Sequence, residues 1–207
     1  MRTLKKIYDR NPWKFVILAW LLYVVSFFLI DNFNRDPVIY LHSRIDDLIP
    51  FSRFAIIPYA SWFPLLVIPM GKRMLKKEYE QVWNLLVPMF IAMFGSLIFY
   101  LIVPNGLHLR PAEVKGSDLC AWLVRSIQSM DTPENVCPSI HVSTTVLIDL
   151  FLQKQHKHET GMRIFLHILA VSICLSTMLL KQHSIIDVFW GLVVALVIQY
   201  CWNHSSK

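Results

Sequence analysis

Long apolar runs dominate this sequence and limit what it can fold into. A helix needs roughly 20 consecutive, mostly apolar residues to cross a bilayer, and several such runs occur in the 207 residues. Hydrophobic side chains make up 55% of the chain and the mean hydropathy is +0.47, which excludes an ordinary soluble domain. We therefore predict an all-α polytopic membrane protein that forms a single domain, residues 1–207.

The apolar runs predict a bundle of six transmembrane helices. Their expected limits, in chain order, are about residues 13–30, 54–70, 82–103, 138–152, 164–180 and 184–202. The first run is expected to be retained as a span, because Asp31-Asn32-Phe33 follows it instead of a small-residue cleavage site. Pro58, Pro64 and Pro69 are expected to kink the second helix.

Two polar stretches on one side of the bundle are predicted to contain interfacial helices, because their apolar residues recur at helical spacing. The shorter set consists of Leu41, Ile45, Leu48 and Ile49, and the longer set of Leu119, Trp122, Leu123, Ile127 and Met130.

The basic residues predict how the bundle is oriented, since lysine and arginine in short loops favour the cytoplasmic side. Most of the 20 such residues lie near the two termini and in the loops 71–81 and 153–163. Both termini are therefore predicted to be cytoplasmic, at the cell (plasma) membrane, with the remaining loops extracytoplasmic. The net charge of +6 follows from this rule and from attraction to anionic lipid. No basic module for nucleic acid is visible.

A polar segment that turns into an apolar helix, Asn135-Val136-Cys137-Pro138-Ser139-Ile140-His141, contains a histidine close to the predicted helix start. Proline suits the first helical position, so Pro138 is expected to leave the N–H groups of Ser139, Ile140 and His141 free at a positive helix end. Such an end binds phosphate. The alternative is that Pro138 only starts a membrane helix and that His141 is a packing residue.

A second histidine, His183, lies four residues before Asp187 and so on the same face of a helix. A carboxylate in that position fixes the imidazole tautomer and raises its basicity, as a nucleophilic histidine requires. The competing interpretation is a capping box, in which Ser184 and Asp187 only satisfy backbone donors at a helix start.

These stretches resemble the motifs of the type 2 phosphatidic acid phosphatase superfamily. Pro138-Ser139-Ile140-His141 is similar to its central P-S-x-H motif, and Ser176, His183 and Asp187 match the spacing of its S-R-x(5)-H-x(3)-D motif. Arg110-Pro111 is similar to the end of its K-x(6)-R-P motif. The motif-bearing part is about residues 104–191. The superfamily also contains headgroup transferases, such as the sphingomyelin and inositol phosphorylceramide synthases, whose H-Y-T-x-D-V pattern the segment 183–188 resembles equally.

The resemblance implies a metal-independent phosphoester reaction that needs no cofactor. His183, oriented by Asp187, attacks phosphorus and forms a phosphohistidine, while His141 acts as general acid and base. Arg110 and Ser139 bind the phosphate oxygens. Water as acceptor gives a lipid phosphatase acting on phosphatidic acid or a polyprenyl diphosphate, and this is the expected function.

Two positions depart from the motifs, because Val103 replaces the lysine of the first and Thr177 the arginine of the third. Lys181 is a substitute phosphate-binding cation or an interfacial lysine. A site short of cations loses more on a doubly charged monoester than on a diester. The alternative function is therefore headgroup transfer, or phospholipase-C-like cleavage, of a phosphodiester lipid.

Two further classes stay open. Two histidines and a carboxylate, here His141, His183 and Asp187, are a ligand set that can hold zinc. Ionisable residues within spans also occur in transporters, and Asp149 is one in the fourth predicted span. A disulfide between Cys120 and Cys137 is open, since both belong to the predicted extracytoplasmic loop.

Overall fold

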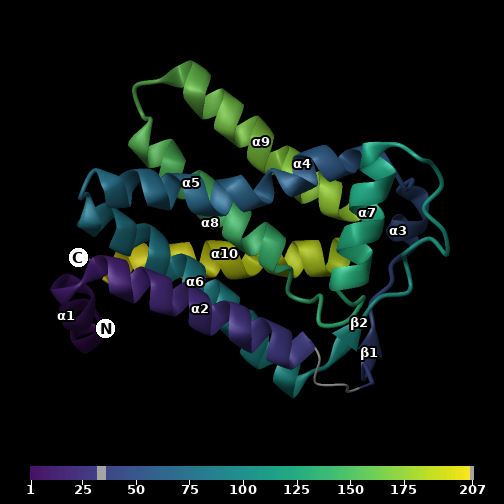
Figure 1. The fold of residues 1–207 in the computed structure, drawn as a ribbon, viewed down its shortest axis with the longest axis horizontal. Coiled ribbons are helices and arrows are strands. Elements are labelled where there is room, and N and C mark those ends of the chain that lie inside the picture. Colours follow the sequence, from purple (N-terminus) through teal and green to yellow (C-terminus); the bar gives the residue numbers. More distant parts are fainter. Residues whose placement is uncertain (32–35, 206–207) are drawn as a thin grey trace.

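The computed structural model describes residues 1–31 and 36–205, and these fold mainly into helices (Figure 1). Asn32 and Phe33, which the sequence placed directly after the first span, lie outside the described residues. The helices are α1 Arg2–Arg10, α2 Pro12–Asp31, α3 Arg44–Leu48, the 3-10 turn η1 Arg53–Ala55, α4 Ile56–Ala60, α5 Trp62–Leu75, α6 Tyr79–Ile102, α7 Leu119–Met130, α8 Ile140–Gln155, α9 Thr160–Leu179 and α10 Ile185–Ser205. Two short strands, β1 Ile39–Tyr40 and β2 Asn105–Gly106, pair in parallel.

The predicted helical membrane fold is confirmed in its class. Within the described residues, five helical stretches are long and apolar enough to cross a membrane: Pro12–Asp31, Arg53–Leu75, Tyr79–Ile102, Thr160–Leu179 and Ile185–Ser205. The remaining predicted span, the fourth in chain order, corresponds to α8, which has 16 residues, whereas a bilayer crossing takes roughly 20. The count of six spans is therefore not established.

Helix α8 forms the centre of the bundle and packs against α5, α6, α9 and α10. Its central position explains its mixed composition, because Ser143, Thr144, Thr145 and Asp149 are all buried among neighbouring helices. The hydroxyl of Thr144, for example, donates to the carbonyl of Ile140 (2.6 Å) and accepts from the indole N–H of Trp62 (2.9 Å). A helix that meets protein on all sides does not need an unbroken apolar surface.

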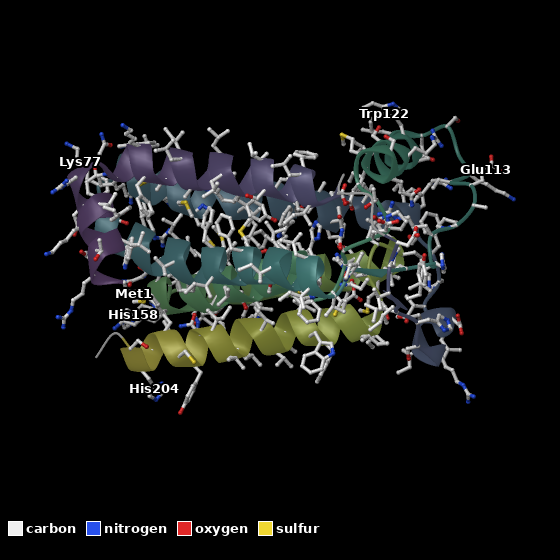
Figure 2. All side chains as sticks on the ribbon, turned by 90° about the horizontal axis from the view of Figure 1, so that it is seen from below. Met1, Lys77, Glu113, Trp122, His158 and His204 are labelled. Atoms are coloured by element: carbon white, nitrogen blue, oxygen red, sulfur yellow. The ribbon has the colours of Figure 1, made fainter. Side chains whose placement is uncertain are left out.

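The two ends of the bundle differ in composition (Figure 2). Met1, Lys77, His158 and His204 lie at one end, whereas Glu113 and Trp122 lie at the other, where α7 crosses beside the β1–β2 pair. Helix α7 has the limits that its apolar spacing predicts, and Leu119, Trp122 and Met130 are exposed on it. The shorter predicted interfacial helix is reduced to the five residues of α3.

The four cysteines are free thiols. Cys120 lies at the start of α7, and Cys137 is buried before α8. Burial, with the nearby Asp187 carboxyl, raises the pKa of the Cys137 thiol to about 12. The disulfide that the sequence left open is not formed in this structure.

Asn105 fixes the chain segment that leads into α8. It is 2% exposed, and its amide nitrogen donates to the carbonyls of Val103 (2.9 Å) and Cys137 (3.1 Å). Its amide oxygen accepts from the N–H groups of Val136 (3.0 Å) and Cys137 (2.8 Å). One side chain thus pairs four backbone groups that have no regular secondary structure to satisfy them.

We predict that Asn105→Ala destabilises the fold by at least about 2 kcal/mol, because each buried backbone group left unpaired costs about 1–3 kcal/mol. Thermal unfolding in detergent micelles measures the effect. Asn203→Ala is the matched control, since Asn203 accepts its hydrogen bonds from Lys154 and Gln199 at an exposed position. Equal unfolding temperatures for the two variants would contradict the role of Asn105.

Candidate active site

Helix α8 begins two residues later than the sequence predicted, at Ile140 instead of Pro138. Ser139 is the N-cap: its backbone is extended, and its hydroxyl accepts from the N–H of Val142 (3.3 Å). Pro138 lies just before the cap, and its carbonyl accepts from the Tyr100 hydroxyl (2.7 Å). The N–H of Ser139, predicted to be free for phosphate, donates to the carbonyl of Asp187 (3.1 Å). Ser139 is fully buried, and its backbone connects the start of α8 to α10 through this hydrogen bond.

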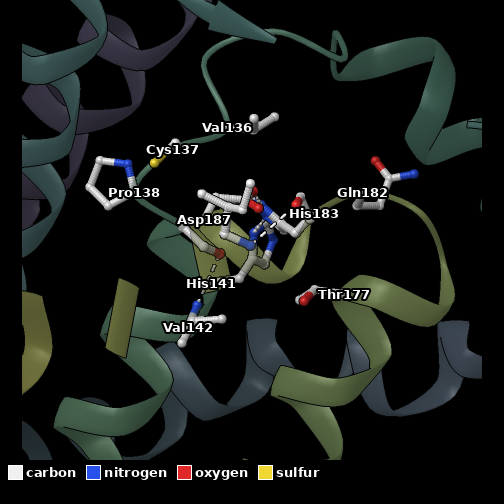
Figure 3. Close-up of polar contacts among 12 residues, drawn as sticks. Val136, Cys137, Pro138, His141, Val142, Thr177, Gln182, His183 and Asp187 are labelled. Carbon is white, nitrogen blue, oxygen red and sulfur yellow. Dashed lines mark hydrogen bonds and ion pairs between the residues drawn. The ribbon is translucent and has the colours of Figure 1, made fainter. Parts of the chain in front are cut away.

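The two histidines and the aspartate lie together where α8 and α10 begin (Figure 3). Nδ1 of His183 is 2.5 Å from Oδ2 of Asp187, and Nε2 of His183 is 3.2 Å from Nδ1 of His141. An Nδ1–H of His183 that donates to the carboxylate leaves Nε2 with its lone pair directed at His141. The structure thus brings His141, His183 and Asp187 into one chain of contacts.

Close packing of α8 and α10 makes this chain of contacts possible. A Cβ atom at Gly191 of α10 would lie 2.7 Å from the carbonyl oxygen of Ser139 and 3.1 Å from Cβ of Val142. Only a residue without a side chain permits this approach. The close approach lets the N–H of Ser139 reach the carbonyl of Asp187, and it holds the two histidines within hydrogen-bonding distance.

A cavity of about 420 Å³ opens beside the histidine pair. Its polar lining includes Asp131, Gln182, His141 and His183. The rest is mainly apolar and aromatic, contributed by α2 (Trp20, Tyr23, Val24, Phe27 and Phe28), by α4 and α5 (Tyr59, Trp62, Phe63, Leu66 and Val67), by Tyr100 of α6 and by Ile127 and Met130 of α7. The rings of Trp62 and Tyr59 lie 4.2 Å and 4.8 Å from the His141 ring, centroid to centroid. The cavity therefore joins a reactive polar end to a long apolar slot.

Arg110 lies next to this end, but both of its terminal nitrogens already donate to protein acceptors. Nη1 donates to the carbonyl of Asp131 (2.7 Å), and Nη2 donates to the carbonyl of Thr132 (3.1 Å) and to Oε1 of Gln182 (2.6 Å). Nη2 is also 3.4 Å from Oδ2 of Asp131. Burial lowers the pKa of the guanidinium from its usual value, and Asp131 opposes that shift. Nε of Arg110 is buried and has no hydrogen-bond partner among the described residues.

The sequence offered Lys181 as a phosphate-binding cation or as an interfacial lysine, and in the structure it contacts α3. Its Nζ donates to the backbone carbonyl of Asp46 (2.5 Å), and Lys181 is not among the residues that line the cavity. Thr177, at the position of the missing arginine, is fully buried, and its carbonyl accepts from the N–H groups of Gln182 (3.0 Å) and His183 (3.2 Å). Thr177 therefore shapes the turn that carries His183.

The three residues that the sequence suggested as metal ligands do not converge on one point. Asp187 contacts Nδ1 of His183, whereas His141 contacts Nε2 on the other side of the same ring. Among the described residues no group of three His, Cys, Asp or Glu side chains has the geometry to hold a metal ion. The arrangement instead matches a histidine that is oriented by a carboxylate and faces a second histidine.

Comparison with known proteins gives no match for this chain: no family model, no curated protein and no solved structure is similar to it. The functional assignment therefore depends on the geometry of the site and on the motif resemblance.

Sequence reasoning missed several residues that build the site. Asp46 accepts hydrogen bonds from Ser184 and Ile185 on either side of the α10 start, and Gln182 connects Arg110 to the His183 turn. The Ser43-x-x-Asp46 spacing is a capping box and was a readable signal for α3, although not for the long-range contact. Asp131 had no signal, because only folding brings it to the cavity.

We predict that Gly191→Ala separates the starts of α8 and α10 and lowers the unfolding temperature. The added methyl group meets a backbone oxygen, which cannot move aside as a flexible side chain does. Overpacking of this kind costs about 1–3 kcal/mol. Gly95→Ala in α6 is the matched control, because a Cβ there has no neighbour within 4 Å. A Gly191→Ala variant as stable as Gly95→Ala would contradict the close packing.

Asp131 gives a prediction for the pH dependence of stability. Desolvation, opposed by Arg110, raises the pKa of its carboxyl from 3.8 to about 6. A carboxyl whose pKa is higher in the folded chain binds its proton more tightly there, so its contribution to stability falls as pH rises from about 4 to about 6. Asp131→Asn is expected to remove this decline, by about 1 kcal/mol or less because the side chain is 34% exposed.

Unfolding temperatures measured at intervals between pH 4 and pH 7 test this expectation. Asp118→Asn is the control. The Ala121 N–H and Arg53 lower the pKa of the Asp118 carboxyl, so the pH dependence of stability that this group causes lies below the range of the Asp131 effect. Parallel curves for the wild type and Asp131→Asn would contradict the raised pKa.

Proposed function

We propose that this chain is a membrane lipid phosphatase that hydrolyses a lipid phosphate ester, of the phosphatidic acid or polyprenyl diphosphate type, through a phosphohistidine on His183. The observation that carries the proposal is the contact chain from Asp187 through His183 to His141, located at the polar end of an apolar cavity. The same residues carry the resemblance to the type 2 phosphatidic acid phosphatase superfamily.

The shape of the cavity supports a substrate with a hydrocarbon tail. Val24 and Phe28 of α2 and Phe63 and Val67 of α5 line it, and each of these side chains is also exposed on the surface of a bilayer-length helix. The slot therefore opens toward the expected lipid phase, where a tail enters without crossing water. Ligand pockets that are mostly apolar, with a few convergent polar groups, are typical of such sites.

In the proposed reaction, Nε2 of His183 attacks phosphorus and the bond to the lipid oxygen breaks. His141, as the imidazolium, gives its proton to the departing alkoxide. His141 then takes a proton from water, which attacks phosphorus, breaks the P–N bond and releases inorganic phosphate. Asp187 stabilises the charge that develops on the His183 ring. In the resting structure His141 contacts the nucleophilic nitrogen directly, so the phosphoryl group has to displace that contact when it binds.

A second candidate, transfer or cleavage of a phosphodiester headgroup, is favoured by the placement of the cations. Lys181 donates to Asp46, Arg110 donates to Asp131, Thr132 and Gln182, and positions 103 and 177 are neutral. Free cationic donors are therefore scarce around the histidines in the described chain. A diester carries one negative charge and a monoester nearly two at neutral pH, so this scarcity costs the diester less.

We further propose that the site faces the extracytoplasmic side of the cell membrane. The basic residue Lys77 and His158 lie at the end of the bundle that also holds both chain termini (Figure 2). Positively charged loops favour the cytoplasm. The cavity is lined by α7 residues at the opposite end. A lipid headgroup in the outer leaflet would lie at that level.

Phosphorus NMR of the products tests the function. Purified protein is incubated with phosphatidic acid, a polyprenyl diphosphate and diester phospholipids, beside a His183→Ala control. Inorganic phosphate formed only by the wild type supports the phosphatase, and a new diester or a released phosphorylated headgroup supports the second candidate. Equal product from both proteins overturns the mechanism. Flux of a solute without any turnover would favour a transporter.

We predict that His141→Ala accumulates the phosphoenzyme when the lipid analogue carries a 4-nitrophenyl leaving group. Such a leaving group needs no protonation, but hydrolysis of the intermediate still needs the base. The bound phosphate should be acid-labile and alkali-stable, as a P–N bond is, and absent from His183→Ala. A phosphoenzyme in His183→Ala would place the nucleophile elsewhere.

Asp187→Asn should lower turnover by about 10²–10⁴-fold, as substitution of the carboxylate that orients a catalytic histidine does in other enzymes.

A further inference from the structure

Asp46 of α3 contacts the start of α10 although it lies far away in the sequence. Its side chain is 1% exposed, and its oxygens accept three hydrogen bonds. The donors are the N–H of Ser43 (2.8 Å), the hydroxyl of Ser184 (2.6 Å) and the N–H of Ile185 (2.9 Å). A carboxylate from another segment therefore caps α10 at the residues that directly follow His183.

The backbone of Asp46 holds the residues on the other side of His183. Its carbonyl accepts from Nζ of Lys181. Lys181 has a φ of 57°, in the left-handed region that is uncommon for residues other than glycine and that often ends a helix, here α9. The side chain that the sequence offered as a phosphate ligand thus ties the turn 181–185 to α3.

The His183 turn consequently has two supports. The carbonyl of Thr177 accepts from the N–H groups of Gln182 and His183 on the α9 side. Asp46 supplies the contacts on the α3 side, to Lys181, Ser184 and Ile185. Asp46 is not among the residues that line the cavity, so it reaches the reacting atoms only through the backbone of this turn.

We propose that Asp46 is a positioning residue that, together with Lys181, holds His183 so that Nδ1 faces Asp187 and Nε2 faces the cavity. This inference rests on the proposed function for its catalytic consequence. Its structural part, the orientation of the imidazole, is independent of any substrate. Shifts of about 1 Å in a reacting group can lower turnover by 10²-fold, so loss of one support acts on the chemical step.

Asp46→Asn is the first test, because asparagine keeps the size of the side chain but has one acceptor oxygen for three donors. We expect kcat to fall about 10–100-fold, the size of effect seen for residues that orient a metal-ligating histidine. KM should stay within about two-fold, since Asp46 does not line the cavity. Asp47→Asn is the matched control: Asp47 is the next residue of α3, and in the described part of the chain its carboxylate pairs with His42 at the exposed surface.

A double-mutant cycle with Ser184→Ala separates positioning from general damage. Ser184→Ala removes the 2.6 Å contact to Asp46 and should also lower kcat. The loss in the double variant should be smaller than the combined losses of the two single variants, because the two residues share one contact. If Asp46→Asn does not fold, Ser184→Ala decides: unchanged kcat overturns the proposal. A rise in KM with kcat unchanged overturns it as well.

Nitrogen NMR of ¹⁵N-histidine-labelled protein provides a readout that needs no turnover. The Nδ1–H signal of His183, assigned by its absence from His183→Gln, should shift or broaden in Asp46→Asn and stay in place in Asp47→Asn. If the wild type converts no phosphoester lipid, the proposed function fails, and this signal still tests the positioning role. An unchanged His183 signal in a folded Asp46→Asn variant overturns that role.

Discussion

Asp187 places a carboxylate in the interior of the protein, where the residue is fully buried. A buried charge without compensation costs several kcal/mol, so it needs a partner of opposite or polarisable character. His183, four residues earlier in the turn before α10, is that partner. The pair can form only where α10 begins, and Gly191 must let α8 come close enough for Ser139 to bind the Asp187 carbonyl. The arrangement of the two central helices thus follows from one buried hydrogen bond and the close packing around it.

Residues outside the spans hold the helix ends that this pair requires. Asn105 satisfies the irregular backbone before α8, and Asp46 caps the start of α10 from α3. Neither is among the residues that line the cavity. Both are buried polar side chains with several partners, the condition under which a polar group stabilises one conformation instead of destabilising the core. The segments between the spans therefore act as the scaffold of the site.

The cavity connects this polar end to exposed apolar side chains of α2 and α5. Aromatic residues of α2, α4 and α5 form its walls, and the His141 ring packs against Trp62 and Tyr59. Desolvation by such walls strengthens any charge interaction at the histidines. Few cationic side chains are free to bind a substrate there, because Arg110 and Lys181 donate to protein acceptors beside the cavity. A substrate has to displace these contacts or carry less negative charge. The headgroup of the lipid and the molecule that accepts the phosphoryl group are therefore the two open choices of the proposed reaction.

The sequence by itself determined the local features. Apolar runs set the five membrane-length helices and the spacing of Leu119 and Met130 set α7, because each depends only on helical geometry. The four-residue interval predicted that His183 and Asp187 meet, but His183 lies in the turn before α10, so it makes this contact from outside the helix. The tertiary structure alone decided what meets across long intervals. It turned Ser139 toward Asp187, brought Lys181 to Asp46, placed Asp131 at the cavity and made the expected fourth span a shorter, buried central helix. Such contacts depend on how whole helices pack, and local periodicity carries no information about them.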